Sequence, residues 1–319
     1  MLDILAITTP IFAIIGLGYL ARAGRIIGHE PLQGIGIFVM YFALPALVIR
    51  ALTQNPLGEV FDPDYLLAYG AGSLVVFALG LAFTLGLEHK PLGTGAIQAL
   101  GMSASNSGFI GYPVAAMVLG SPAAMFLALN MLIENLLIIP LALTLAELGR
   151  QTGNGFRGTL HQTALRLVRN PVLIGLLIGV LLAVMGRPIP APLTKAIDML
   201  AGAAGPAALF VIGGSLYGLR PKGMVRDMGQ IAIGKLVLHP LAVFGIFLLL
   251  PDIDPLLLTG ALLFACAPMI SVYPIFGQRF GLSDITAAAL MVSTLGSFVT
   301  ISLVLWLMRH SSLFALSSG

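Results

Sequence analysis

The chain has 319 residues, 58% of them hydrophobic and only 9% charged, and its mean hydropathy is +1.01. This composition excludes an ordinary water-soluble protein and indicates a polytopic membrane protein. The net charge of +3 comes from basic residues that are spread over several connectors without interleaved aromatic residues, so the sequence predicts no nucleic-acid partner.

Ten candidate membrane spans follow one another along the chain, each long enough for a helix across an apolar layer of about 30 Å. The first has no basic N-terminal region and no small-residue cleavage site, so we expect a retained helix rather than a signal peptide. A polar connector, residues 147 to 164, divides the chain into halves of five spans, residues 1 to 146 and 165 to 310. The ten spans are residues 3 to 23, 31 to 53, 65 to 87, 93 to 119, 122 to 146, 165 to 185, 192 to 217, 229 to 250, 255 to 279 and 284 to 308.

The distribution of basic residues predicts the orientation of the spans. If the N-terminus is outside, most of the 16 lysines and arginines fall in connectors on the inner side, as the positive-inside rule requires. We therefore expect a multi-pass protein of the cell (inner) membrane, in contact with lipid, with both termini outside and the connector 147 to 164 in the cytoplasm.

The prolines indicate an internal repeat. One constant offset, that from Pro10 to Pro171, also aligns Pro31 with Pro192, Pro45 with Pro206 and Pro113 with Pro274. Because each half has an odd number of spans, the second half enters the membrane from the opposite side, which makes the halves an inverted repeat. The alternative is a coincidence among helix-bundle prolines.

Two spans that this repeat pairs, 93 to 119 and 255 to 279, contain residues that oppose a continuous helix. Gly108, Gly111 and Pro113 interrupt the first, and Pro268 and Pro274 interrupt the second. Interrupted backbone at membrane depth must be buried in protein or line a wet cavity. We expect the two breaks to cross near the midplane, with half-helices that start near Pro113 and Pro274 and whose free amides favour a carboxylate.

The residues around these breaks form the predicted site. The alternative is that they are ordinary proline kinks whose serines bond back to their own helix. Tyr41 and Pro45 in the second span are candidates for the scaffold side of the pocket, although a packed apolar seam explains them equally well. The predicted substrate-binding residues are Ser103, Ser105, Asn106, Ser107, Tyr112, Pro113, Pro268, Ser271, Tyr273 and Pro274, together with Tyr41 and Pro45.

Charged residues occur within the spans, where an unpaired charge costs a few kcal/mol or more. Glu134 lies about 18 Å into the fifth span, and Lys235 lies about 9 Å into the eighth, with His239 one turn further on the same face. The hypothesis is that Glu134 is a protonatable coupling residue, with Lys235 or His239 as its partner or as a ligand for the anion. The alternatives are a structural ion pair or, for Lys235, a snorkelling side chain.

Other function classes find little support. The phosphate-binding sequence GxxxxGK[ST] is missing, the single Cys266 excludes an intramolecular disulfide, and the histidines are scattered, so we expect no ATP-driven transport, no enzyme, no metal and no cofactor. Two readings of transport stay open, one driven by protons or the membrane potential and one coupled to sodium. A channel fits the paired breaks less well. Arg50 near the outer end of the second span could attract anions or be an interfacial arginine.

The string NSGFIGYP, from Asn106 to Pro113, together with YFALPALVIRAL (41 to 52) and RNPVLIGLLIGVLL (169 to 182), resembles the auxin efflux carrier family, which includes plant PIN carriers and bacterial malonate and malate transporters. The resemblance implies an all-α fold of ten helices as a 5+5 inverted repeat, similar to bile-acid symporters and sodium-proton antiporters. It implies a scaffold from spans 1, 2, 6 and 7, through which two copies form a homodimer, and a transport domain from spans 3 to 5 and 8 to 10.

For the site, the same resemblance implies Asn106 as a ligand of the substrate carboxylate and Pro113 and Pro274 as the crossing prolines. The expected function is secondary active transport of small organic anions, malonate or another dicarboxylate among them, by elevator-type alternating access. Protons are the expected coupling partner, and sodium coupling of the bile-acid type is the alternative.

Overall fold

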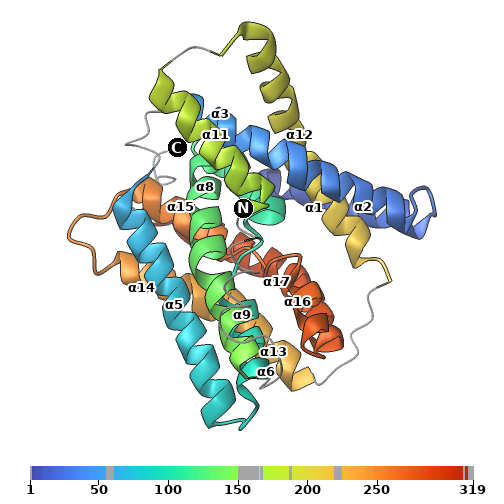
Figure 1. Ribbon diagram of the computed structural model, residues 1–319, viewed down its shortest axis with the longest axis vertical. Helices are drawn as coiled ribbons and strands as arrows, with labels where there is room; N and C mark the ends of the chain where they lie inside the picture. Colours follow the sequence, from blue (N-terminus) through green and yellow to red (C-terminus); the bar gives the residue numbers. More distant parts are fainter. Residues whose placement is uncertain are drawn as a thin grey trace. The chain divides into compact units, whose positions relative to one another are not determined.

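The computed structural model describes residues 2–54, 61–149, 165, 168–186, 189–218, 225–311 and 313–314, and the side chains from residue 9 onward. Within these residues the fold is entirely helical, and no strand occurs (Figure 1). Most of the connector 147 to 164 lies outside the described residues. The prediction of an all-helical polytopic membrane protein is confirmed at this level.

Six helical stretches of the described chain are long and apolar enough to cross a membrane, and four shorter apolar helices accompany them. Ten crossings and the inverted repeat stay predictions. The six are His29–Gln54, Pro63–Gly86, Ala123–Leu148, Ala191–Leu216, Val225–Phe247 and Ser283–Arg309, and the four are Thr9–Ala23, Ser107–Leu119, Pro171–Met185 and Pro255–Ala265.

The chain forms two compact units, each assembled from three separate segments. Unit 1 comprises Met1–Asp62, Ser107–Met131 and Val168–Gly218. Its helices are α1 (Leu2–Ala23), α2 (His29–Phe38), the π-helix η1 (Val39–Ala43), α3 (Leu44–Gln54), the π-helix η2 (Ser107–Gly111), α7 (Tyr112–Leu119), most of α8 (Ala123–Leu132), α11 (Pro171–Met185) and α12 (Ala191–Leu216).

Glycines allow the helices of unit 1 to pack closely. α11 lies on α3, where a Cβ on Gly175 would come within 2.8 Å of the Pro45 backbone and a Cβ on Gly179 within 2.7 Å of the Leu52 side chain. Asn170 caps the start of α11, and its side-chain oxygen accepts hydrogen bonds from two amides of the first turn. Gly186 follows the last residue of the helix, and its φ of 60° lies in the left-handed region that favours glycine.

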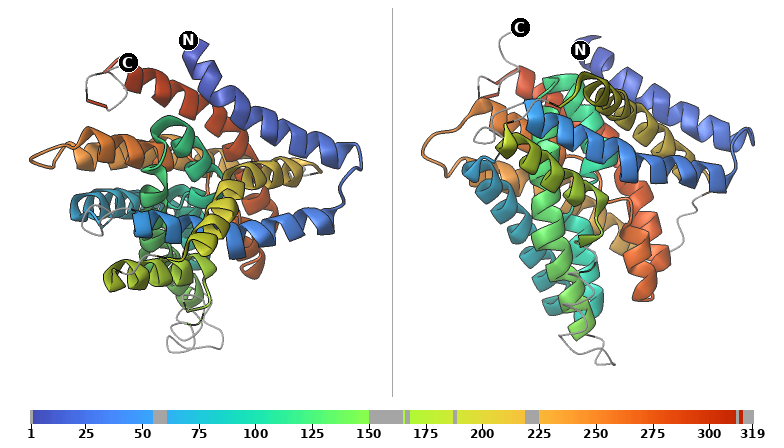
Figure 2. Two further views of the ribbon diagram at one scale, coloured as in Figure 1. Left: turned by 90° about the horizontal axis from the view of Figure 1, so that it is seen from above. Right: turned by 45° about the horizontal axis from the view of Figure 1, so that its top comes forward.

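Unit 2 comprises Pro63–Asn106, Leu132–Leu167 and Leu219–Gly319. Within it, α5 packs along α6, and α6 packs along α9 (Figure 2). Its helices are α5 (Pro63–Gly86), α6 (Leu92–Ser103), the π-helix η3 (Ile133–Ile138), α9 (Ile139–Leu148), α13 (Val225–Ile233), the π-helix η4 (Gly234–Leu238), α14 (His239–Phe247), α15 (Pro255–Ala265), α16 (Tyr273–Arg279) and α17 (Ser283–Arg309).

Each of the four π-helical segments that the described residues contain ends two residues before a proline: Pro45, Pro113, Pro140 or Pro240. A proline inside a helix lacks the N–H that would bond the carbonyl four residues earlier, and its ring clashes with that carbonyl. The wider π spacing, in which a bond spans one residue more, relieves this conflict while the helix continues. The prolines therefore widen these helices without breaking them.

This explains a difference from the prediction for the span 93 to 119. The glycine and proline pattern predicts a break at Gly108, Gly111 and Pro113 and a half-helix that starts near Pro113; α7 does start at Tyr112, but as the continuation of η2. The structure instead interrupts the helix at residues 104 to 106, and the chain is helical again from Ser107. In the span 255 to 279 the break covers residues 266 to 272, and α16 starts at Tyr273 with Pro274 in its first turn, as the proline pattern predicts.

Candidate functional site

The two helix breaks meet inside unit 2. Ser105 and Met269 form an isolated antiparallel β-bridge, and the amide of Asn106 donates to the carbonyl of Pro268 at 2.7 Å. Ser105, Asn106 and Met269 are buried. The interrupted backbones therefore pair with each other, which satisfies polar groups that lipid would leave without partners.

Asn106 also joins the two breaks through its side chain. Its Nδ2 donates to Ser271 Oγ at 2.8 Å, while only 3% of the residue is exposed. Two predicted site residues that are 165 positions apart in the chain are thus hydrogen-bonded to each other. A carboxylate bound here would meet an amide and a hydroxyl already held in place.

The three serines before and after Asn106 differ in their surroundings. Ser103 Oγ donates to the carbonyl of Ala99 at 2.8 Å, so this serine bonds back to its own helix, as the alternative reading predicted. Ser105 Oγ instead lies 3.0 Å from the hydroxyl of Tyr69 on α5. Ser107, the first residue of η2, is buried in unit 1. Ser105 is therefore a stronger candidate for the site than Ser103.

Glu134 lies at the same break. Its Oε1 accepts a hydrogen bond from the amide of Ser105 at 3.0 Å, and 3% of the residue is exposed. Glu134 belongs to η3, the π-helical segment before Pro140. The carboxylate thus holds a backbone donor released by the interruption of α6, one residue before Asn106.

Lys235 takes the corresponding place at the other break. Its Nζ donates to the carbonyl of Ala265, the last residue of α15, at 2.7 Å, and lies 2.7 Å from His239 Nδ1. Lys235 and His239 are fully buried. This hydrogen bond satisfies the carbonyl end of α15 that the break exposes, and the C-terminal end of a helix favours a positive charge on the bound amino group.

His239 extends this contact to α5. Its Nε2 lies 2.8 Å from Ser73 Oγ, and its ring meets the Tyr69 ring edge-on, with the centroids 5.5 Å apart. A charged lysine can only donate, so Nδ1 accepts from Lys235 and the hydrogen on Nε2 is available to Ser73. The buried chain therefore runs from Ala265 through Lys235 and His239 to Ser73.

The predicted charges thus reach the same region of unit 2, each bound to a different break. Glu134 is close enough to Lys235 to act on it electrostatically. Their direct pairing stays a prediction. The alternative that Lys235 snorkels to the membrane surface is wrong, because the residue is 0% exposed and its amino group donates to the carbonyl of Ala265 at a buried helix end.

Two further predicted site residues of unit 2, Tyr273 and Pro274, lie in the first turn of α16. Tyr273 is fully buried, and a Cβ on Gly101 of α6 would lie 2.6 Å from its ring. Pro274 follows in the first turn of α16. This close approach of α6 to the aromatic ring fixes the start of the half-helix after the second break.

Unit 1 holds the other predicted residues. Tyr112 and Pro113, at the start of α7, lie beside Gly205 of α12, with closest approaches of 3.9 Å from a Cβ placed there. Pro45 is buried against α11, in keeping with a packed apolar seam. Tyr41, in contrast, is 56% exposed in η1.

Sequence reasoning missed Tyr69 and Ser73, which carry the network to α5. They are four residues apart, so they share one face of the helix, and a polar pair at that spacing in an apolar span was the signal available. Their partners on other helices could not be inferred from α5 alone.

A second polar cluster, also missed, lies at the α5–α6 connector. Lys90 Nζ binds Glu88 at 2.8 Å and Asp227 of α13 at 2.7 Å, and Gln230 donates to Glu88 at 2.9 Å. Burial works to raise the pKa of Glu88, but the hydrogen bonds from Lys90 and Gln230 and the nearby positive charges outweigh it and hold that pKa below its ordinary value. Burial likewise opposes the charge of Lys90, yet its two carboxylate partners raise its pKa. The cluster ties α13 to the connector.

No group of three or more His, Cys, Asp or Glu that could hold a metal ion occurs among the residues that the structure describes. Cys266, in the second break, is buried with a free thiol. The chemistry available at the breaks is therefore hydrogen bonding and charge, from an amide side chain, hydroxyls, one carboxylate and one ammonium.

Buried, interrupted helices held together by polar side chains, in a chain this apolar, are typical of a polytopic membrane protein. The particular family follows from comparison with known proteins. Residues 4–306 match the family described as Membrane transport protein, so this chain belongs to that family, the auxin efflux carriers. The resemblance seen in the sequence is thereby confirmed.

Three relatives are informative. A protein of Rhizobium meliloti (strain 1021) named Putative malonate transporter is 31% identical over 98% of this chain and 98% of its own. The Lysosomal cholesterol signaling protein of Mus musculus is 24% identical over 95% of this chain but 37% of its own length. An Uncharacterized transporter of Methanothermobacter thermautotrophicus (strain Delta H) is 25% identical over 93% of this chain and 95% of its own. The family description and the names of the Rhizobium and Methanothermobacter relatives point to membrane transport.

Proposed function

We propose that this protein is a secondary active transporter of small organic anions, with the substrate carboxylate bound where the two helix breaks meet. The observation that carries the proposal is the Asn106–Ser271 hydrogen bond between the breaks. A polar bond at a paired break in an apolar chain is typical of a transport site. The helix that resumes at Ser107 begins one residue after Asn106, and helix N-termini favour anions.

Malonate or another dicarboxylate is the proposed substrate. The relative named Putative malonate transporter covers 98% of this chain, which supports a substrate of this size and charge. Asn106 is the proposed carboxylate ligand, with Ser105 and Ser271 beside it. Tyr273 and Pro274 would shape the pocket from the start of α16.

We propose an elevator mechanism on a ten-helix inverted repeat, in which a transport domain carries the substrate across the membrane along a scaffold. The two compact units support this division, because α5, α6 and α13 to α17 gather in one unit and α1 to α3, α11 and α12 in the other. The segment Ser107–Met131 groups with the scaffold helices, which differs from the division expected from the family. A homodimer through the scaffold and an inner-membrane location with both termini outside complete the proposal.

Proton coupling through Glu134, with Lys235 or His239 as its partner, is the proposed driving step. Its support is that both charges bind the backbone at the breaks, so a change of either charge acts directly on the substrate site. Sodium coupling is the alternative. Replacing sodium by choline in a transport assay separates the two, because only a sodium-coupled carrier would lose uptake.

The test of the substrate site is exchange transport in proteoliposomes loaded with unlabelled malonate. Labelled malonate uptake is measured with a competing panel of monocarboxylates, malate and auxin-like acids. Asn106→Ala is expected to reduce uptake at least tenfold, because hydrogen bonds to a charged ligand contribute about 1.5–3 kcal/mol each. Ser103→Ala, whose hydroxyl bonds its own helix, is the control and should retain uptake. Equal transport by the Asn106 variant would reject the site.

A further inference from the structure

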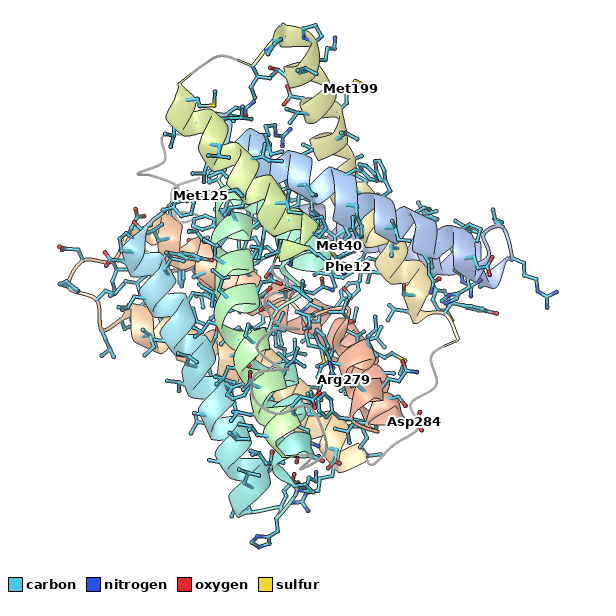
Figure 3. The ribbon with its side chains drawn as sticks, viewed as in Figure 1. Phe12, Met40, Met125, Met199, Arg279 and Asp284 are labelled. Carbon is cyan, nitrogen blue, oxygen red and sulfur yellow. The ribbon has the colours of Figure 1, made fainter. Side chains whose placement is uncertain are left out.

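Unit 1 contains a cavity that the proposed substrate site does not use. It has a volume of about 440 Å³ and lies among the C-terminal ends of α3 and α11 and the start of α12. An adjoining hollow of about 640 Å³ shares three of its residues and adds Lys195 and Met199, the latter labelled on α12 in Figure 3. Volumes of this size suit small-molecule ligands.

The charges around this cavity favour an anion. Arg50 and Lys195 flank a single carboxylate, Asp198, so the described lining has one positive charge more than negative. A dicarboxylate would add two negative charges to this set. The cavity and its adjoining hollow are therefore electrostatically suited to the class of substrate proposed above.

Arg50 forms only a long, partly exposed ion pair with Asp198. The closest approach of Arg50 Nη1 to Asp198 Oδ1 is 3.9 Å, beyond hydrogen-bonding distance, and the side chains are 29% and 43% exposed. Partly exposed ion pairs of this kind contribute little. The guanidinium also interacts with the hydroxyl of Tyr112. Its planar group of N–H donors matches a carboxylate better than any other side chain does.

The threonines of the cavity do not compete for this role. Thr53 Oγ1 donates to the carbonyl of Ile49 at 2.8 Å, and Thr194 Oγ1 donates to the carbonyl of Ile189 at 3.3 Å. Their protons are engaged by backbone, so they offer an anion no free donor. Among the lining residues, the charged donors Arg50 and Lys195 carry the attraction.

We propose that this cavity is a second carboxylate site, in which Arg50 binds the anion and Asp198 competes with it for the guanidinium. The proposal rests on the proposed function for its substrate class, but not on the site at the breaks. Tyr112, which Arg50 contacts, lies six residues along the chain from Asn106. The second site would thus concentrate the substrate on the chain segment that follows the first break.

The experiment measures equilibrium binding of labelled malonate to the full chain in nanodiscs. Asp198→Asn removes the competing carboxylate, so binding at this site should tighten about two- to fivefold. Arg50→Gln should weaken it at least tenfold, and added salt should weaken it in the wild type. Both substitutions break the same ion pair, so a purely structural pair predicts equal effects on thermal stability and no opposite effects on binding.

The controls separate this site from the one at the breaks. Thr53→Val and Arg309→Gln, the latter outside the cavity lining, should leave binding unchanged. In an Asn106→Ala background the Arg50-dependent, salt-sensitive binding should persist.

If Asp198→Asn weakens binding or leaves it unchanged, or if Arg50→Gln leaves it unchanged, the second site is rejected while the site at the breaks stands. If Arg50-dependent binding persists but Asn106→Ala transports normally, the site at the breaks is rejected instead. If the wild type binds no malonate, both are rejected.

Discussion

Glu134 offers the sharpest test of how the first break is held, because two substitutions separate its acceptor from its charge. Glu134→Gln keeps an oxygen for the Ser105 amide, now 3.0 Å from the carboxylate, but removes the charge. Glu134→Leu removes both. A bond to a charged group contributes about 1.5–3 kcal/mol and a neutral one about 0.5–1.5, so glutamine should cost about 1 kcal/mol.

Glu134→Leu should lower the free energy of unfolding by more than Glu134→Gln does, because it leaves the buried Ser105 amide without this acceptor, which adds a cost of about 1–3 kcal/mol. Thermal unfolding in detergent should therefore rank the wild type first, glutamine second and leucine last. In proteoliposomes, the Glu134→Gln variant should still transport malonate measurably, but the transport rate should no longer depend on pH. Equal stability of the two variants would refute the bond as the support of the break, and an unchanged pH profile would refute coupling through this residue.

Three further substitutions test the surrounding structure. Gly101→Ala should destabilise by about 1–3 kcal/mol in thermal unfolding, because its Cβ would lie 2.6 Å from an aromatic ring at the start of α16, whereas Gly229→Ala, with nothing within 4 Å, should not; equal effects would contradict the packing. Because the pKa of Glu88 is lower in the folded protein than its ordinary value of 4.5, ionised Glu88 stabilises the fold above that value, and this stabilisation is lost as the pH falls through the folded pKa. Lys90→Met should therefore flatten the acid side of a plot of stability against pH, and an unchanged plot would exclude a stabilising role for this cluster. Lys235→Met should lower malonate uptake at least tenfold and stability by about 1–3 kcal/mol, because it leaves the carbonyl at the end of α15 without this donor; wild-type uptake would argue against its role.

The sequence predicted the apolar helices well because their signal is local. Length and hydropathy alone identify stretches such as Pro63–Gly86 and Ser283–Arg309. The second break was also locally encoded, because Pro268 lies within it and Pro274 fits the first turn of the helix that follows. In both cases the residues that set the structure are neighbours in the chain.

The first break was misplaced because its cause is not local. Glycine and proline between residues 108 and 113 suggested a break there, but π-helical spacing absorbs Pro113 and the chain stays helical. The actual interruption, at residues 104 to 106, pairs with backbone some 160 positions later, through the amide of Asn106 and the carbonyl of Pro268. No pattern within one span contains that partner.

The cluster of Glu88, Lys90 and Asp227 was missed for a related reason. In the sequence, Glu88 and Lys90 fall in the connector between the predicted spans 65 to 87 and 93 to 119, and Asp227 lies just before the predicted span 229 to 250. Their proximity depends on how α13 packs near the end of α5, which is decided by tertiary structure. Charge partners across helices are the part of this fold that a single sequence specifies least directly.

In the proposed mechanism, the geometry of the first break makes proton binding and substrate binding mutually dependent. Glu134 holds the amide of Ser105, and Asn106, the proposed carboxylate ligand, is the next residue. A proton on the carboxylate weakens its bond to that amide, and a substrate that moves Asn106 also moves the amide. Binding linkage is reciprocal, so in this mechanism protons and malonate change each other's affinity by the same factor. Malonate affinity in nanodiscs should therefore depend on pH in the wild type and not in Glu134→Gln, and a pH dependence that survives in the variant would place the coupling proton elsewhere.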